Sequence, residues 1–313
     1  MLCKQLILIT GATATGKTEI SLDIAGILPK VEILSVDSRQ IYRYMDIGTA
    51  KPTLDQRALC PHHFIDILDP DQIYNAGEYS KAARPLIEEI WAREGIPVLV
   101  GGTGLYWQSV LDGFFTDHTD YQQVRVELEH RLQREGLESL YAELGRLDPI
   151  THGRIDPSDR QRILRGLEVA IGGAKPLSEL KNVKEESAFE CKAQMVCLTM
   201  DRSKLHKRIA QRVDAMIADG LVDEVQALIK KGYGRDSAAL GTLGYLELLD
   251  CLEGQSTQEE AVELIKLRTR QFAKRQMTWY RRDRRLRELN LETWGRAGVV
   301  QRIIAAWEHA RKG

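Results

Sequence analysis

Four short apolar runs occur in the N-terminal two thirds of the chain. They are Leu6–Thr10, Glu32–Val36, Pro97–Val100 and Ala193–Thr199. Runs of this length between turn-forming residues are typical of buried strands, and helical patterns lie between them. The helix predicted after the first run, Thr18–Leu28, ends at Pro29. This alternation predicts an α/β fold, a parallel sheet with helices on both faces.

The pattern changes over residues 119–185, where apolar residues recur every three to five positions among charges and no strand-like run occurs. They are Val124, Leu128, Leu132, Leu137, Leu140, Leu144 and Leu147. We therefore predict a helical insertion domain over 119–185, between core segments 1–118 and 186–313. After Asp201 the pattern is almost entirely helical.

Composition narrows the class of protein. The 313 residues are 43% hydrophobic and 28% charged, with a net charge of −1, as in an ordinary globular protein. No run is apolar over 18 residues, and the N-terminus lacks a cleavable signal, so we expect a cytoplasmic protein with no membrane contact. The five cysteines show no C-x-x-C or zinc-finger spacing, so we expect them to be reduced.

Residues 11–18 read GATATGKT, which fits the phosphate-binding pattern G-x-x-x-x-G-K-[ST] in its expected place between a strand and a helix. The predicted phosphate-binding residues are Gly11, Ala12, Thr13, Ala14, Thr15, Gly16, Lys17 and Thr18. The glycines let backbone N–H groups converge on phosphate oxygens, and the helix N-terminus adds partial positive charge. Lys17 supplies a full charge, and the Thr18 hydroxyl can ligate Mg²⁺. The loop indicates a polyphosphate ligand but not a reaction.

Two further features lie where predicted strands end. Asp37 follows the second strand and could bind metal, act as a base or cap a helix. The third strand ends in VGGTG, where Gly101 and Gly102 allow close approach and Thr103 offers a hydroxyl. A tight turn and a ligand contact explain this second segment equally well.

These segments together resemble the bacterial tRNA dimethylallyltransferase family. The resemblance rests on GATATGKT, SVDSRQIYRYMDIGTAKP (35–52), PHHFIDILDPDQIYNAGEY (61–79) and VLVGGTGLYWQSVLDG (98–113). It continues through 148–170, 243–249 and 268–282 and so covers nearly the whole chain. It implies a P-loop kinase-like core, Mg²⁺ as cofactor, and transfer of a dimethylallyl group from dimethylallyl diphosphate to the N6 amine of the adenine 3′ of the anticodon, position 37 of tRNA.

The resemblance also implies roles for individual residues. Asp37 takes the proton of the adenine amine, Thr103 lies near the same nucleotide, and Arg212 and Lys17 face the diphosphate. Spacing alone would place Arg212 on a solvated helix face. The residues expected to bind the tRNA anticodon stem-loop are Asp37, Ser38, Arg39, Gln40, Thr103, Arg125, Gln161, Arg162, Ile163, Leu164, Arg165, Lys274 and Arg275. We expect the insertion domain to act as a clamp on that stem-loop.

A basic run near the C-terminus supports RNA binding independently. Residues 266–287 include ten lysines and arginines but only one acidic residue, Asp283. Trp279 and Tyr280 lie in the same stretch. In a chain that is otherwise nearly neutral, this density beside aromatic rings suits phosphate contact and base stacking. Lys274 and Arg275 are therefore expected to contact tRNA.

Three other functions remain open from the residues alone. A P-loop nucleotide or small-molecule kinase would share the loop and Asp37 but would not need the basic helices. An isopentenyltransferase acting on free adenine nucleotides would share Thr103 as well, with less use for the QRILR block, 161–165. A non-catalytic RNA-binding module would leave the phosphate loop unused. We expect a monomer.

Overall fold

The computed structural model describes residues 4–113, 119, 121–173, 175–180 and 188–312. The chain forms two compact units. The first, here called the sheet unit, comprises Met1–Leu111 and Phe189–Gly313, and the second, the helical unit, comprises Asp112–Ala188. The segment predicted as an insertion, 119–185, falls within the helical unit, and most residues at its two junctions lie outside the described part.

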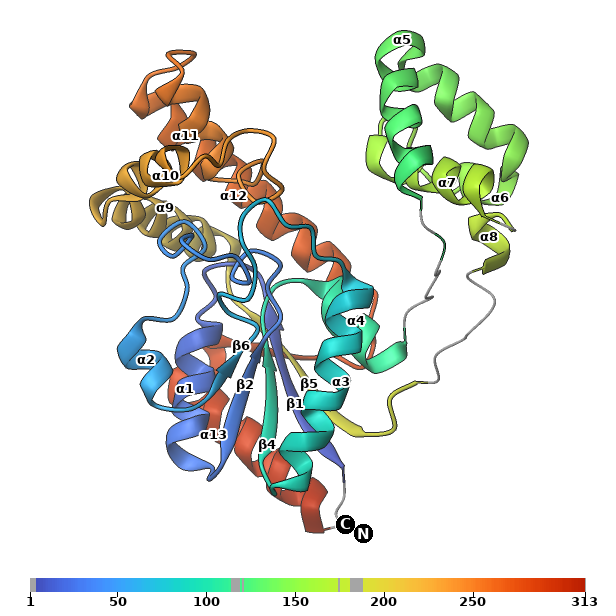
Figure 1. Cartoon of the computed structure of the whole chain (residues 1–313). Coiled ribbons are helices and arrows are strands. Elements are labelled where there is room, and N and C mark those ends of the chain that lie inside the picture. The colour runs from blue at the N-terminus through green and yellow to red at the C-terminus, as the bar shows by residue number, and fades with distance from the viewer. Residues whose placement is uncertain (1–3, 114–118, 120, 174, 181–187, 313) are drawn as a thin grey trace. The chain divides into compact units, whose positions relative to one another are not determined.

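Six parallel strands form one sheet in the order β3-β2-β4-β1-β5-β6 (Figure 1). They are β1 (Gln5–Gly11), β2 (Val31–Ser35), β3 (His62–His63), β4 (Ile96–Val100), β5 (Lys192–Thr199) and β6 (Arg287–Asn290). The four strands predicted from apolar runs are confirmed as β1, β2, β4 and β5. The strand β1 lies centrally and pairs with β4 on one side and β5 on the other.

Helices cover both faces of the sheet, as the alternating pattern predicts (Figure 1). Ile7 and Ile9 of β1 pack on one face with α1 (Lys17–Ile27) and α13 (Leu291–Lys312). The other face carries α3 (Ala76–Ala92) and α4 (Gly104–Asp112). Because every residue of β1 is buried, the phosphate loop that follows it starts from a fixed position.

Two strands were not predicted. The strand β3 has only two residues, and β6 reads RELN, with Leu289 as its only buried residue. Both lie at sheet edges, where the backbone pairs with one neighbour and no apolar run is required. The prediction that the chain is almost entirely helical after Asp201 did not include the strand Arg287–Asn290, which pairs with β5.

The C-terminal third adds a second core above the sheet's carboxyl edge. Its helices are α9 (Arg202–Ala218), α10 (Leu221–Lys230), α11 (Tyr245–Leu252) and α12 (Gln258–Tyr280). Apolar residues of these helices pack around Ile41 and Met45, which come from the segment after β2. The short helix α2 (Leu54–Ala58) follows this segment and buries no residue.

The helical unit has its own core of leucines and isoleucines. Its helices are α5 (Gln122–Leu147), α6 (Pro149–His152), α7 (Arg160–Gly172) and α8 (Leu177–Leu180). Leu128 and Leu144 of α5 pack against Ile163 and Leu167 of α7. The helix α5 kinks at Gly136, which has φ 78° and ψ 166°. Among the described residues, no helix is long and apolar enough to cross a membrane.

Candidate active site

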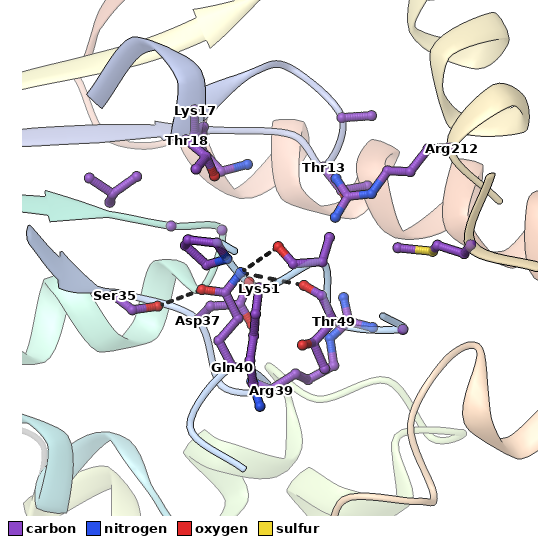
Figure 2. Close-up of a pocket in the computed structure, with 18 of the residues that line it drawn as sticks. Thr13, Lys17, Thr18, Ser35, Asp37, Arg39, Gln40, Thr49, Lys51 and Arg212 are labelled. Atoms are coloured by element: carbon purple, nitrogen blue, oxygen red, sulfur yellow. Dashed lines mark hydrogen bonds between the residues drawn. The ribbon is translucent and has the colours of Figure 1, made fainter. Parts of the chain in front are cut away.

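A cavity of about 400 Å³ opens at the carboxyl ends of β1, β2 and β4 (Figure 2). It brings together segments that are far apart in the sequence: the phosphate loop, the segment from Asp37 to Pro52, and side chains of α9 and α12. Of the four residues expected to be catalytic, Lys17, Asp37 and Arg212 line this cavity. Thr103 does not line it, and its hydroxyl lies against Ser38 instead.

The phosphate loop turns sharply between β1 and α1. Ala14 and Gly16 both adopt positive φ, at 64° and 86°. At Gly11 a Cβ atom would lie 2.7 Å from the carbonyl oxygen of Leu198, so this position has no room for a side chain. The helix α1 begins immediately afterwards at Lys17, and its N-terminus therefore points its free N–H groups toward the loop.

Lys17 is held by the loop itself. Its Nζ donates to the carbonyl oxygens of Gly11 at 3.0 Å and Ala12 at 2.9 Å. Burial, followed by the nearby positive charge of Arg212, lowers the pKa of Lys17 to about 8, and the carboxylate of Asp37 partly offsets this. An anionic ligand in the loop would favour the charged form of the amine.

Arg208 and Arg212 of α9 place two more cations at the cavity. Arg212 faces the space between the loop and Asp37 (Figure 2), and burial together with the neighbouring Arg39 lowers its pKa. Arg208 lies beside the loop, 3.6 Å from the position that a Cβ of Gly16 would take. Within the described residues neither arginine has a carboxylate partner, so this positive charge is available to an anionic ligand.

Asp37 lies at the start of a turn that leaves half of its carboxylate open. Its Oδ1 accepts a hydrogen bond from Arg39 N at 2.9 Å. In the part of the chain that the structure describes, no group donates to Oδ2. Thr103 supports the same turn, because its Oγ1 accepts from Ser38 N at 3.1 Å and its own N–H donates to Val36 O.

The opposite wall of the cavity is a loop fixed by buried polar contacts. Lys51, whose side chain is 1% exposed, pairs with Asp46 at 2.8 Å and Asp66 at 2.6 Å. The Gln40 carboxamide accepts from Ser35 Oγ at 2.9 Å and donates to the carbonyls of Thr49 and Ala50 (Figure 2). Gln40 was predicted to contact tRNA, and in this structure its side chain holds the cavity wall.

Similarity to known proteins agrees with this geometry. The family model described as IPP transferase matches residues 40–283. The chain belongs to the IPP transferase family. Its fold and enzyme class are thus those of a prenyltransferase, and the kinase and non-catalytic alternatives are set aside.

Relatives extend the match beyond the family model. A tRNA dimethylallyltransferase from Desulforudis audaxviator is 42% identical over 304 residues, which is 97% of each chain. The crystal structure of a tRNA isopentenylpyrophosphate transferase from Bacillus halodurans is 35% identical, has a TM-score of 0.72 and covers 99% of this chain and 98% of its own. A eukaryotic dimethylallyltransferase acting on tRNA is 26% identical, with a TM-score of 0.78, over 96% of this chain and 78% of its own.

The IPP transferase family match includes the helical unit, where several predicted tRNA contacts lie. Arg125 forms a two-pronged ion pair with Glu168, at 2.7 and 3.2 Å, and Arg165 contacts the same carboxylate at 3.1 Å. Ile163 and Leu164 are buried in the core of this unit, so their side chains serve packing. Gln161 and Arg162, by contrast, are exposed.

The predicted basic run divides into paired and unpaired cations. Lys266 forms ion pairs with Asp214 and Glu263, and Arg268 pairs with the buried Glu247. Lys274 and Arg275 are exposed and have no carboxylate partner among the described residues. Arg270 also lies in α12, which ends at Tyr280, so the arginines from Arg281 to Arg287 belong to a turn and to β6.

Gln276 is one of the cavity residues that the sequence reasoning missed. Gln276, inside the basic run, lines the cavity and bonds to the phosphate loop. The only signal in the sequence is its spacing from Ala273 and Tyr280, three and four residues away, which puts all three on one helix face. That spacing identifies a buried face but not its partner.

Proposed function

We propose that this chain transfers the dimethylallyl group of dimethylallyl diphosphate to the exocyclic N6 amine of the adenine at position 37 of tRNA, 3′ of the anticodon, and releases diphosphate. The single observation that carries the proposal is one cavity holding a phosphate loop, two cations without carboxylate partners among the described residues, and a half-open carboxylate. A site that only bound polyphosphate would not need Asp37, and a site that only bound a nucleobase would not need the phosphate loop.

The chemistry assigns a task to each group. The allylic C–O bond breaks, and its electron pair leaves with the diphosphate. Loop N–H groups, Lys17 and Arg212 stabilise that negative charge where it develops. The lone pair of N6 forms the new C–N bond, and Oδ2 of Asp37 accepts the proton that the amine releases. Thr103 contributes by holding the turn that aims Asp37.

The residues present fit Mg²⁺ bound through the diphosphate rather than a metal held by protein ligands alone. No group of three or more His, Cys, Asp or Glu side chains capable of holding a metal occurs among the described residues. Mg²⁺ commonly keeps several waters and combines one or two protein oxygens with substrate phosphates. The Thr18 hydroxyl would supply such an oxygen. When bound, Mg²⁺ neutralises charge on the leaving group.

RNA binding is proposed on two surfaces. Lys274 and Arg275 of α12 would contact backbone phosphates beside the cavity, and Gln161, Arg162 and Arg165 would do so from the helical unit. The target adenine must leave its stack to reach Asp37, which is simplest in a single-stranded loop.

We also propose that the enzyme acts as a cytoplasmic monomer and that the helical unit closes on the stem-loop. Solution scattering tests the closure. If the protein gives the same scattering profile with and without RNA, once the scattering of the RNA itself is subtracted, the closure is refuted.

The test is a mass measurement. The protein is incubated with Mg²⁺, dimethylallyl diphosphate and an unmodified tRNA anticodon stem-loop, with AMP and ATP in parallel tubes. We expect a gain of one C5H8 unit on the RNA alone. A gain on AMP instead would identify an enzyme of free nucleotides, and consumption of ATP without prenyl transfer would overturn the proposal.

A further inference from the structure

One carboxamide of α12 spans two parts of the cavity. Gln276 is 7% exposed and lies on the buried face of the helix. Its Oε1 accepts a hydrogen bond from the backbone N–H of Thr13 at 2.9 Å. Its Nε2 donates to the carbonyl oxygen of Gly102 at 3.0 Å. A single side chain therefore joins α12 to the phosphate loop and to the turn after β4.

The glycine turn after β4 is shaped for this helix. A Cβ on Gly102 would lie 2.3 Å from Nε2 of Gln276, and a Cβ on Gly104 would lie 2.3 Å from Nε1 of Trp279. The hydroxyl of Tyr280 donates to the same carbonyl of Gly102 at 2.7 Å. The absence of side chains at these glycines thus lets α12 approach the cavity closely.

The sides of the same helical turn that point away from Gln276 carry exposed cations. Lys274 precedes Gln276 by two residues, so the two side chains leave the helix about 200° apart. Lys274 and Arg275 are exposed. The guanidinium of Arg275 lies 5.9 Å from the Phe272 ring, which also contacts Arg39 of the cavity at 5.2 Å. One turn of α12 thus presents cations to solvent and a carboxamide to the phosphate loop.

We propose that Gln276 is a positioning residue that couples RNA binding on α12 to diphosphate binding in the loop. The inference rests on the proposed function, because it requires RNA to bind Lys274 and Arg275. RNA bound to these cations restricts the motion of α12. Because Gln276 accepts a hydrogen bond from Thr13 N–H, the phosphate loop is then also restricted in its motion. The ordered loop then loses less conformational entropy when diphosphate binds. By linkage, diphosphate must raise the affinity for RNA by the same factor.

The experiment measures that factor with unreactive ligands. The dissociation constant of inorganic diphosphate, in the presence of Mg²⁺, is determined by calorimetry with and without a saturating unmodified anticodon stem-loop. The reverse titration gives the RNA affinity with and without diphosphate. We expect the same tightening in both directions, roughly 5- to 150-fold. In Gln276→Met, which keeps the side-chain length but removes both hydrogen bonds, we expect a factor near one.

A matched control uses a glutamine remote from the cavity. Gln194 of β5 donates from Nε2 to the carbonyl of Ile303 at 2.9 Å. Gln194→Met removes a comparable hydrogen bond and should leave the coupling factor at the wild-type value. Amide hydrogen exchange gives a second readout, because Thr13 N–H should exchange faster in Gln276→Met and unchanged in Gln194→Met.

The outcomes separate this inference from the proposed function. Loss of coupling in Gln276→Met alone supports it. Wild-type coupling in Gln276→Met, or a factor of one in the wild type while RNA still binds, overturns it and leaves the proposed function intact. Failure of the RNA to bind the wild type overturns both. Should Gln276→Met not fold, Gly102→Ala provides the test, since its Cβ displaces the Gln276 carboxamide, and retained coupling there overturns the inference.

Discussion

The ammonium group of Lys17 donates a hydrogen bond to the carbonyl oxygen of Ala12 at 2.9 Å, five residues earlier in the same loop. A second bond, to Gly11, holds the group from the same side. The amine is thus positioned before any ligand arrives, but it is buried beside Arg212, which favours its neutral form. The free enzyme therefore carries a titratable cation in its phosphate site.

The first prediction concerns pH. The pKa of Lys17 is lowered to about 8, so the free enzyme holds the charge below this pH and loses it above. Binding of dimethylallyl diphosphate should be pH-independent with respect to this group below about 8 and weaken above it. Above this pH the affinity should fall by up to roughly tenfold per pH unit, because Lys17 must then take up a proton for the ligand to bind. Calorimetry between about pH 7.5 and 9.5, in buffers of different ionisation enthalpy, measures both effects.

Lys17→Arg is the control for this pH dependence. Its guanidinium stays charged over the whole range, so its affinity should be flat even if it is weaker overall. A wild-type affinity that is equally flat up to about pH 9.5 would contradict the prediction.

The second prediction tests the proton acceptor. Asp37→Asn keeps an oxygen that can accept from Arg39 N, so the turn should persist, but the amide cannot take a proton. We expect the rate of the prenyl-transfer step to fall roughly 10²- to 10⁴-fold while tRNA affinity changes little. Single-turnover kinetics and RNA binding assays measure the two quantities. Asp55→Asn, on the exposed helix α2, is the control and should keep wild-type turnover. Near-full turnover in Asp37→Asn would remove Asp37 from the mechanism.

The third prediction concerns salt. RNA affinity should fall steeply with salt concentration, because each phosphate neutralised by a cation releases counterions. Replacing Lys274 and Arg275 together by alanine should weaken binding and reduce the logarithmic salt slope by roughly 1 for each phosphate that is no longer neutralised. Lys266→Ala is the matched control on the same helix, since Lys266 is already paired with Asp214 and Glu263. An equal effect of Lys266→Ala would show that general charge, and not this pair, determines affinity.

The fourth prediction concerns stability. Lys51→Met removes a buried cation that donates to Tyr42 O, Asp46 and Asp66. Asp46 is exposed and Asp66 keeps its ion pair with Arg57, so the free energy of unfolding should fall by about 1–3 kcal/mol. Lys30→Met is the control, because the Lys30–Glu94 pair is exposed and should contribute about 0–1 kcal/mol. Urea denaturation measures both. Equal stability of the two variants would mean that Lys51 does not anchor the cavity wall.

Sequence patterns predicted the parts of the fold that depend on local apolar runs. The strands β1, β2 and β4 are five or more residues long and buried throughout, β5 is buried over its second half, and all four were predicted. Placing the phosphate loop and Asp37 together followed from a general rule, since the carboxyl ends of parallel strands share one edge. Edge strands such as β6 form through backbone pairing with a neighbour distant in sequence, which no local pattern records.

The same reasoning explains what was missed in the cavity. Gln276 looks like one polar residue among many in a basic helix, and its partners Thr13 and Gly102 precede it by 263 and 174 residues. Lys51 could not be told from a ligand-binding lysine, because its partner Asp66 becomes a neighbour only after the loop folds. Conversely, Ile163 and Leu164 were predicted from the resemblance as RNA contacts, although their apolar character suits the core that they occupy.

The strand order β3-β2-β4-β1-β5-β6 also bears on synthesis. The ribosome synthesises β1 first. Its neighbour β5, and Gln276, which accepts a hydrogen bond from the phosphate loop, are synthesised much later. A nascent polypeptide can therefore carry the complete glycine-rich loop and Asp37 without possessing a cavity. The hydrogen bond from Thr13 N–H to Gln276 can therefore form only after the chain has been synthesised through α12.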